Sequence, residues 1–277
     1  MKKNRAIVFT ISKDLAFSVA CVMMDIKKLC PAIADEIVIL HDGISKKDQI
    51  LLKSILPTRF IVYDFPFDIS LIPINILNYF TKMVFAKFEC LKLLDEYKNV
   101  LLTDSDVVFQ RDISELFEYC NSGFKILLGG NNVGSQFHYP IDEYDMNIEC
   151  TASGIFVLQD HLKDYKKLYD FCYKSLLKYS DKVYLPEQAI FDIMIQEFDI
   201  DICPIDAKVY SAHPTDTIKA VNAKIIHAYG QPKFWNGIQN DQWNKNYQTW
   251  IEMGGSKYRK KTILSRVYVK LKNFLKL

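Results

Sequence analysis

Runs of apolar residues alternate along the first hundred positions with stretches whose apolar residues recur at helical spacing. The runs predict buried strands and the stretches between them predict helices. Ser45 is an expected N-cap, because its hydroxyl can accept a backbone N–H of the next turn. Continuously apolar strands alternating with helices predict a doubly wound α/β fold, whose mostly parallel sheet is flanked by helices. The predicted strands are 6–10, 36–40, 59–65 and 99–103, and the predicted helices are 15–29, 46–55 and 76–97.

The second half of the chain has shorter apolar runs. Trp243, Tyr247 and Trp250 share one face of a predicted helix, which indicates core positions. The predicted strands are 124–130, 153–159, 200–203, 207–211 and 224–228, and the predicted helices are 160–178, 187–197 and 240–252. Without a clear linker before Gly254, the pattern indicates one domain over residues 1–253 and a separate tail over 254–277.

The composition is that of a folded protein, with 49% hydrophobic and 25% charged residues in 277 positions. The seven cysteines are scattered without a C-x-x-C pair, so neither a zinc site nor a disulfide framework is expected. We expect them to act as small buried apolar residues in a reducing compartment. The N-terminus lacks the apolar core of a signal peptide, and the expected location is the cytoplasm.

Basic residues gather at the C-terminal end. Residues 257–277 carry eight basic and no acidic residues, which leaves 27 basic and 33 acidic residues in the body. Ile263, Val267, Leu271 and Phe274 fall at helical spacing between them, as in a helix that lies on an anionic membrane. A solvated helix or a disordered tail is the alternative. The acidic body, without a recognition module, argues against nucleic acid as a partner.

Asp104 and Asp106 follow directly on the predicted strand 99–103. A chain with this much aspartate contains roughly two D-x-D triplets by chance, and the second is Asp199–Asp201, so position has to decide. Side chains two apart in extended backbone point to the same side, and the C-terminal ends of parallel strands face the ligand crevice. Asp112 and Glu115 fit a capping box of a following helix. The alternative is a solvated turn.

A second polar group follows the predicted strand 224–228. His227, Gly230 and Lys233 form an H-x-x-G-x-x-K pattern. An imidazole can complete a metal site begun by two carboxylates, glycine permits a phosphate to approach the backbone, and lysine offers it a positive charge. Two carboxylates and one histidine suit Mn²⁺ better than Ca²⁺ or Mg²⁺. A lone histidine after a strand is more often structural.

Taken in order, "TDSDVVFQRDISELF", "SGIFVLQ", "LPEQAIFD" and "HAYGQPKFW" resemble the motifs of glycosyltransferase family 8, retaining enzymes of the GT-A fold. The resemblance implies a metal ion, Mn²⁺ or else Mg²⁺, held by Asp104, Asp106 and His227. It also implies a UDP-sugar bound by Thr10, Ser12, Lys87, Asp104, Ser105, Gly230 and Lys233.

The same resemblance implies that Glu187 and Gln188 lie beside the anomeric carbon as catalytic residues. Because an amide is a poor nucleophile, attack from the face that UDP leaves is favoured over a double displacement. First-turn polar residues of a helix are the alternative for this pair. Lys87 stands where the family usually has arginine, and Ala152 where it often has asparagine. Trp235 and Phe234 adjoin the expected site, and could pack in the core or stack on an acceptor sugar.

The expected function is Mn²⁺-dependent transfer of a hexose, glucose or galactose, from a UDP-sugar to a bacterial surface glycan such as lipopolysaccharide, capsule or a lipid-linked oligosaccharide. The protein would lie on the inner face of the cell membrane, held peripherally by its tail. One alternative is a metal-dependent phosphatase or nucleotidyltransferase, although the first strand does not end in the nucleophilic aspartate that such a phosphatase needs. The other is a non-catalytic peripheral membrane protein with a degenerate sugar-nucleotide site.

Overall fold

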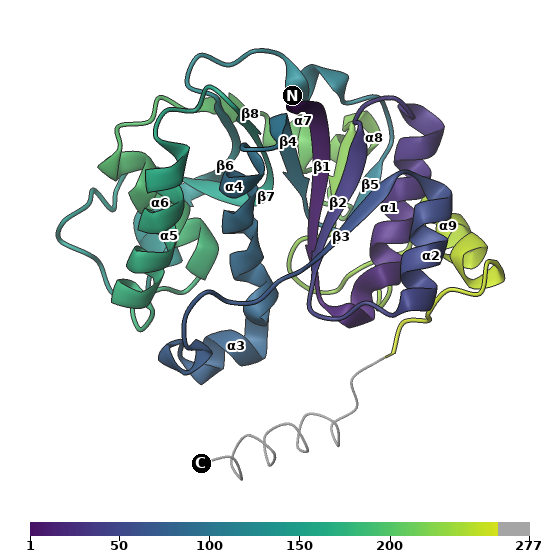
Figure 1. Cartoon of the computed structure of the whole chain (residues 1–277), viewed down its shortest axis with the longest axis horizontal. Helices are drawn as coiled ribbons and strands as arrows, with labels where there is room; N and C mark the ends of the chain where they lie inside the picture. Colours follow the sequence, from purple (N-terminus) through teal and green to yellow (C-terminus); the bar gives the residue numbers. More distant parts are fainter. Residues whose placement is uncertain (260–277) are drawn as a thin grey trace, which may run out of the picture.

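The computed structural model describes residues 1–259 and has a central sheet between two layers of helices (Figure 1). The seven strands lie in the order β3-β2-β1-β4-β7-β6-β8. The first four strands are parallel, whereas β7 runs antiparallel to both of its neighbours and β8 is parallel to β6. The strands are β1 (Lys3–Ile11), β2 (Glu36–His41), β3 (Thr58–Val62), β4 (Tyr97–Thr103), β6 (Phe124–Asn132), β7 (Glu149–Gln159) and β8 (Cys203–Ile205). The predicted α/β fold is confirmed.

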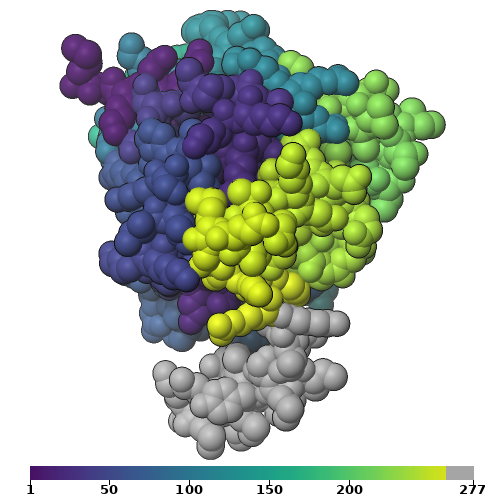
Figure 2. All heavy atoms as spheres, turned by 90° about the vertical axis from the view of Figure 1, so that its right-hand side faces the viewer, coloured from purple at the N-terminus to yellow at the C-terminus, as the bar shows by residue number. Residues whose placement is uncertain are grey.

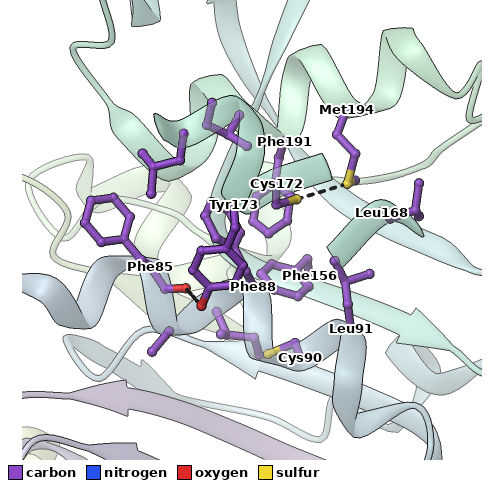
Figure 3. Close-up of a cluster of buried hydrophobic side chains, with 14 of the residues drawn as sticks. Phe85, Phe88, Cys90, Leu91, Phe156, Leu168, Cys172, Tyr173, Phe191 and Met194 are labelled. Atoms are coloured by element: carbon purple, nitrogen blue, oxygen red, sulfur yellow. Dashed lines mark hydrogen bonds between the residues drawn. The ribbon is translucent and has the colours of Figure 1, made fainter. Parts of the chain in front are cut away.

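Two hydrophobic clusters cover the two faces of the sheet. On β1, Ala6 and Val8 face one cluster while Ile7 and Phe9 face the other, which explains why the strand is apolar throughout. The first cluster includes α4, α5 and α6, where the ring of Phe191 packs edge-on against the rings of Phe88 and Phe156 (Figure 3). The helices are α1 (Ala16–Leu29), α2 (Lys46–Ile55), α3 (Ile74–Phe80), α4 (Glu89–Leu93), α5 (Tyr165–Tyr179), α6 (Pro186–Glu197), α7 (Ala207–Tyr210), α8 (Thr217–Asn222) and α9 (Asp241–Glu252).

The second cluster includes α1, α2 and α9. The C-terminal helix α9 packs against α1, so the last and the first α-helix of the described chain are neighbours (Figure 2). Trp243 and Trp250 are buried as predicted, and Tyr247 is partly buried beside them. Their burial makes α9 part of the same domain.

Several predicted elements are confirmed. Ser45 caps α2 as expected, because its side chain accepts the backbone N–H of Asp48. The predicted helices 15–29, 187–197 and 240–252 match α1, α6 and α9 within a few residues. Asp199 and Asp201 are exposed to solvent, and the strand predicted at 200–203 is displaced to β8 at Cys203–Ile205.

Three predicted elements are wrong. The predicted helix 76–97 is interrupted at Thr81, whose φ of 64° ends α3, and continues as a 3-10 helix over Lys82–Phe88 before α4. The predicted strand 207–211 is instead the helix α7, started by the Asp206 side chain. Asp112 accepts the backbone N–H of Ser114 at a short 3-10 helix (Ser114–Phe117), while the Glu115 carboxylate binds Lys224 and Tyr210 instead of closing a capping box.

The cysteines also depart in part from expectation. Cys120 and Cys203, which are 83 positions apart in the sequence, form a disulfide between the loop that precedes β6 and the strand β8. The expectation that every cysteine is a free buried residue is therefore wrong for this pair. The two cysteines are far apart in the sequence, so no short cysteine motif predicts their bond. It holds for Cys21, Cys30, Cys90, Cys150 and Cys172, which are free and buried.

The expected membrane-associating residues Ile263, Val267, Leu271 and Phe274 lie outside the described residues. Within residues 1–259, every helix is too short or too polar to cross a bilayer.

Candidate active site

Asp104 and Asp106 lie between β4 and a short strand, β5 (Val107–Phe109), at the C-terminal edge of the parallel strands. Backbone hydrogen bonds fix both residues: the N–H of Asp104 donates to Gly154 O at 2.9 Å, and Asp106 O accepts from the N–H of Ala228 at 2.9 Å. The two carboxylates are therefore held by β7 on one side and by the segment after β9 on the other.

His227 ends β9 (Ile225–His227), which pairs with β5 in antiparallel register so that Val107 lies opposite His227. Its Nε2 atom lies 3.6 Å from Asp104 Oδ2 and 3.3 Å from Asp106 Oδ1. One ligand atom from each of the three side chains lies within 4.8 Å of the others. The structure thus assembles the three expected metal ligands across more than a hundred residues of sequence.

Gly154 makes room for this cluster. A Cβ atom at this position would lie 2.6 Å from His227 Cε1, closer than real Cβ atoms approach, and 3.3 Å from Asp104 Oδ2, a tight contact. Only glycine leaves the imidazole and the carboxylate where they are. Gly154 belongs to the predicted strand 153–159, but its part in the site could not be predicted, because these contacts are all tertiary.

Ser211 orients the imidazole. Its Oγ lies 2.9 Å from His227 Nδ1, which leaves Nε2 for the two carboxylates. The outer hydrogen bond of a metal-binding histidine fixes its tautomer and ring orientation, and removing such a partner typically costs 10–100-fold in metal affinity. Ser211 was also missed from the sequence, where it lies at the end of the wrongly predicted strand 207–211.

We therefore expect Ser211→Ala to weaken metal binding by roughly 10–100-fold while the fold is kept, because only the partner of Nδ1 is lost. Isothermal titration with Mn²⁺ measures the change. Ser54→Ala, which removes a hydroxyl that bonds only to Leu51 O on α2, is the control. Unchanged Mn²⁺ affinity in Ser211→Ala would show that the hydrogen bond from Ser211 is not needed to orient the His227 imidazole for metal binding.

Lys233 reaches back to the same cluster. Its Nζ is ion-paired with Asp106 and donates to Ala228 O at 2.9 Å. Gly230, between His227 and Lys233, has a φ of 71°, which glycine adopts without strain. Burial alone would raise the pKa of Asp106, but His227 and Lys233 outweigh it and hold this pKa well below its usual range. Asp106 is therefore an anion at every physiological pH.

Lys87 bridges the metal cluster and α6. Its buried Nζ lies 3.0 Å from Asp104 Oδ1 and 3.2 Å from Glu187 Oε1, and donates to Ser153 O at 3.1 Å. Burial alone would lower the pKa of Lys87, but the two carboxylates raise it above its usual value. Lys87 is thus a permanent cation that ties Asp104 to Glu187.

Ser153 organises the start of α6. Its Oγ donates to Glu187 Oε1 at 2.7 Å, and its backbone N–H donates to Gln188 Oε1 at 3.1 Å. Glu187 is buried, so it is more than a solvated residue of a first helical turn. The carboxylate and the amide are therefore fixed relative to Lys87 before any ligand arrives.

All of these groups open into one cavity of about 730 Å³. Trp235 lines it too, whereas Phe234 is buried against Trp243 in the core. Ala152 and Asn131 also line it, and Ser105 is held there by a 2.9 Å hydrogen bond from Ser18 of α1. The cavity brings together every residue singled out as a ligand or catalyst from the sequence: Thr10, Ser12, Lys87, Asp104, Ser105, Asp106, Glu187, Gln188, His227, Gly230 and Lys233. Their individual roles stay predictions.

Comparison with known protein families matches residues 6–239 to the family described as Glycosyl transferase family 8. The chain belongs to glycosyltransferase family 8. The matched range contains the whole cluster of Asp104, Asp106 and His227 as well as Lys233. The resemblance seen in the four motifs is confirmed.

Solved structures give this family 8 chain the GT-A fold. The apo structure of the bifunctional glycosyltransferase WbbM matches over 92% of this chain with 16% identity and a TM-score of 0.68. The galactosyltransferase LgtC, in complex with donor and acceptor sugar analogs, matches over 92% of this chain and 97% of its own, with 15% identity and a TM-score of 0.64. The chain spans about half the length of WbbM, 52%. A search of curated proteins finds no match.

Behind the cavity of this family 8 chain, Asp192 connects α6 to β7. Its Oδ1 accepts the backbone N–H of Thr151 at 2.9 Å. Among the described residues, its Oδ2 has no hydrogen-bond partner, and neither have the nearby acceptors Gln136 Oε1 and Thr151 Oγ1. Burial, which outweighs the stabilisation of the carboxylate by Thr151, raises the pKa of Asp192 to about 7. An ionised Asp192 therefore destabilises the folded protein.

We expect Asp192→Asn to be more stable than the unchanged protein at about pH 8, by roughly 2–4 kcal/mol, and equally stable near pH 4. The folded protein keeps this proton up to about pH 7 and the unfolded chain loses it near pH 4, so stability falls as pH rises between these values. Urea unfolding at both pH values measures the difference. Asp199→Asn, at an exposed carboxylate, should show no such trend; a pH-independent difference for Asp192→Asn would contradict the assignment.

Proposed function

We propose that this family 8 protein is a retaining glycosyltransferase that moves a hexose, glucose or galactose, from a UDP-sugar to a glycan acceptor in a Mn²⁺-dependent reaction. The observation that carries the proposal is the cluster of Asp104, Asp106 and His227 in one cavity with Lys233 and with the fixed pair Glu187 and Gln188. The acceptor we propose is a bacterial surface glycan: lipopolysaccharide, capsule or a lipid-linked oligosaccharide. LgtC, which has this fold, was solved with donor and acceptor sugar analogs.

The residues present fit a divalent cation. Two carboxylates and an imidazole offer mixed oxygen and nitrogen ligands, which suit Mn²⁺. Gly154 leaves space beside the imidazole, and Ser211 fixes its orientation. Asp104, Asp106 and His227 would hold the ion. When bound, the ion supplies Lewis-acid stabilisation of the negative charge that develops on a departing diphosphate.

The protein's own cations complement that charge. Lys233 offers a point charge at the edge of the cavity, and Gly230 presents its backbone without a side chain in the way. Lys87 is engaged by Asp104, Glu187 and Ser153, so we assign it to hold the two carboxylates in place as well as to face the diphosphate. Lysine cannot make the bidentate contact with a diphosphate that arginine makes. This difference favours the role of Lys87 in holding Asp104 and Glu187 in place.

Glu187 and Gln188 would act at the anomeric carbon. Positive charge develops there as the bond to UDP breaks, and a buried carboxylate and an amide oxygen both stabilise it. Gln188 is a poor nucleophile, and its Oε1 already accepts a hydrogen bond from Ser153. We therefore propose that the acceptor hydroxyl attacks from the face that UDP leaves, which retains the configuration of the sugar.

The location we propose is the inner face of the cell membrane, in the cytoplasm. The motivation is the charge distribution: eight basic residues in 257–277 follow a body with an excess of acidic residues. Each basic residue near an anionic surface contributes about 1 kcal/mol at most.

A thermal-shift panel tests the proposal directly. UDP-glucose, UDP-galactose and their N-acetyl forms are each added with Mn²⁺, and one hexose donor should raise the midpoint of unfolding most. Stabilisation by a ligand at a hundredfold excess over its Kd is about 2.7 kcal/mol. Hydrolysis of that donor with and without Mn²⁺ follows. Binding without any turnover would indicate a degenerate site, and no response to any UDP-sugar would refute the proposal.

A further inference from the structure

The edge of the sheet that carries the cavity also carries an exposed apolar segment. Phe67, Leu71, Ile74 and Tyr79, between β3 and the end of α3, are 45%, 56%, 56% and 76% exposed. We call residues 67–79 the apolar edge segment. Large apolar side chains exposed together mark surfaces that contact proteins, ligands or lipids. The next residues, Phe80 and Thr81, line the cavity, so the apolar edge segment borders its opening.

A basic site lies at the same edge. The strands β1 to β4 are parallel, so the segments after β2, β3 and β4 all leave the sheet at the same edge. The helix α2 begins at this edge, and α3 lies below it (Figure 1). The last described residues are tied to the first turn of α2, because the N–H of Ser256 donates to Asp48 Oδ1 at 3.0 Å. Exposed basic residues surround this point: Lys46, Lys47, Lys257 and Arg259. We call these four described residues the basic exit. In the sequence, residues 260–277 add six more basic and no acidic residues.

We infer that this edge docks on an anionic lipid bilayer, with the apolar edge segment among the lipids and the basic exit over their headgroups. Lipid attachment that lasts takes two signals, an apolar insertion and a basic patch. The apolar edge segment adjoins the cavity-lining residues Phe80 and Thr81, and the basic exit lies where α2 begins, at the same edge of the sheet. The apolar edge segment contains one carboxylate, Asp68, which stays charged while it caps the turn Ile69–Leu71. Asp64, just before the segment, is ion-paired with Lys82.

The role of this docking rests on the proposed function. A cavity that opens at the bilayer surface selects an acceptor anchored in lipid over a free saccharide. The test of the docking does not depend on that function, because lipid binding and donor turnover are measured separately. Neither Leu71 nor Ile74 lines the cavity.

The experiment uses the full chain and vesicles of phosphatidylcholine, alone or mixed with phosphatidylglycerol. We expect sedimentation with the mixed vesicles only. The double variant Leu71→Ser with Ile74→Ser should bind them roughly tenfold more weakly, since each change removes part of an apolar side chain from lipid. Leu71→Trp should bind more tightly than the unchanged protein, which loss of folding cannot mimic.

The matched control is Ile218→Ser with Val221→Ser. These residues of α8 are 79% and 71% exposed and precede β9, away from the cavity edge (Figure 1). The control should bind vesicles as the unchanged protein does, and all three variants should hydrolyse the donor normally. If neither the unchanged protein nor any variant hydrolyses the donor, the proposed function is refuted. The vesicle-binding result then still tests the lipid docking independently.

Three results would overturn the inference. The first is equal vesicle binding by the unchanged protein and the Leu71 and Ile74 double variant, which would assign attachment to the basic residues alone. The second is equal loss in the control. The third is a dimer that the double variant dissociates, seen by size-exclusion chromatography, because the apolar edge segment would then be covered by a second copy of the chain.

Discussion

Asp106→Asn should abolish Mn²⁺-dependent binding of the UDP-sugar and lower turnover at least about a thousandfold, since Lewis-acid stabilisation of a leaving group is worth several kcal/mol. Asp106 contributes Oδ1 near His227 and pairs with Lys233, and amide nitrogen is a poor ligand for a hard cation. The shape of the side chain is kept, so the loss reports on charge. Isothermal titration with Mn²⁺ and a donor-hydrolysis assay measure the two effects.

The control for Asp106→Asn comes from the same sequence pattern. Asp199–Asp201 is the other D-x-D triplet, and both of its aspartates are exposed. Asp199→Asn should change neither metal binding nor turnover. Normal turnover in Asp106→Asn would remove the metal site from the mechanism, whatever the family resemblance implies.

Gly154→Ala has the second largest expected effect. The added Cβ would lie 2.6 Å from His227 Cε1 and 3.2 Å from Nδ1, so the imidazole or the strand has to move. Displacing one ligand of three should weaken Mn²⁺ binding at least about a hundredfold. Loss of only the hydrogen-bond partner of a ligand costs roughly 10–100-fold, and loss of the ligand itself should cost as much or more. Titration with Mn²⁺ measures the affinity, and thermal unfolding measures the accompanying loss of stability.

Gly129→Ala separates the two consequences of that change. Its Cβ would lie 2.6 Å from Cys150 Sγ, an equally close contact that involves no metal ligand. Both variants should lose stability, and only Gly154→Ala should lose metal binding. If both bind Mn²⁺ normally, the space beside His227 is larger than these contacts indicate.

The sheet could be predicted because its strands are apolar on both faces. β1, β2 and β4 each read as an unbroken apolar run, and the alternation of Ala6 and Val8 with Ile7 and Phe9 shows the cause. The break at Thr81 could not be predicted, since apolar spacing continues through it. Its reason is tertiary: the turn lets Thr81 Oγ1 approach Ser12 Oγ at 3.3 Å beside the cavity.

The residues of the site also fall into those that the sequence predicts and those that only tertiary contacts reveal. Asp104, Asp106 and His227 could be proposed from the sequence because strand ends and residue chemistry are both visible there. Gly154, Ser153 and Ser211 could not, because each acts through a contact with a residue distant in the chain. The Cys120–Cys203 disulfide has the same character: its partners meet only when β8 joins β6.

The distance in sequence between the metal ligands has a consequence for folding. Asp104 and Asp106 follow β4, and His227 meets them only through the pairing of β5 with β9, so an unfolded chain has no preformed site for a cation. An ion that binds only the native state raises its stability by mass action. Bound Mn²⁺ would thus hold β9, the last strand of the described chain, against β5 in its middle, and titrating the ion would report what fraction of the population has formed this pair.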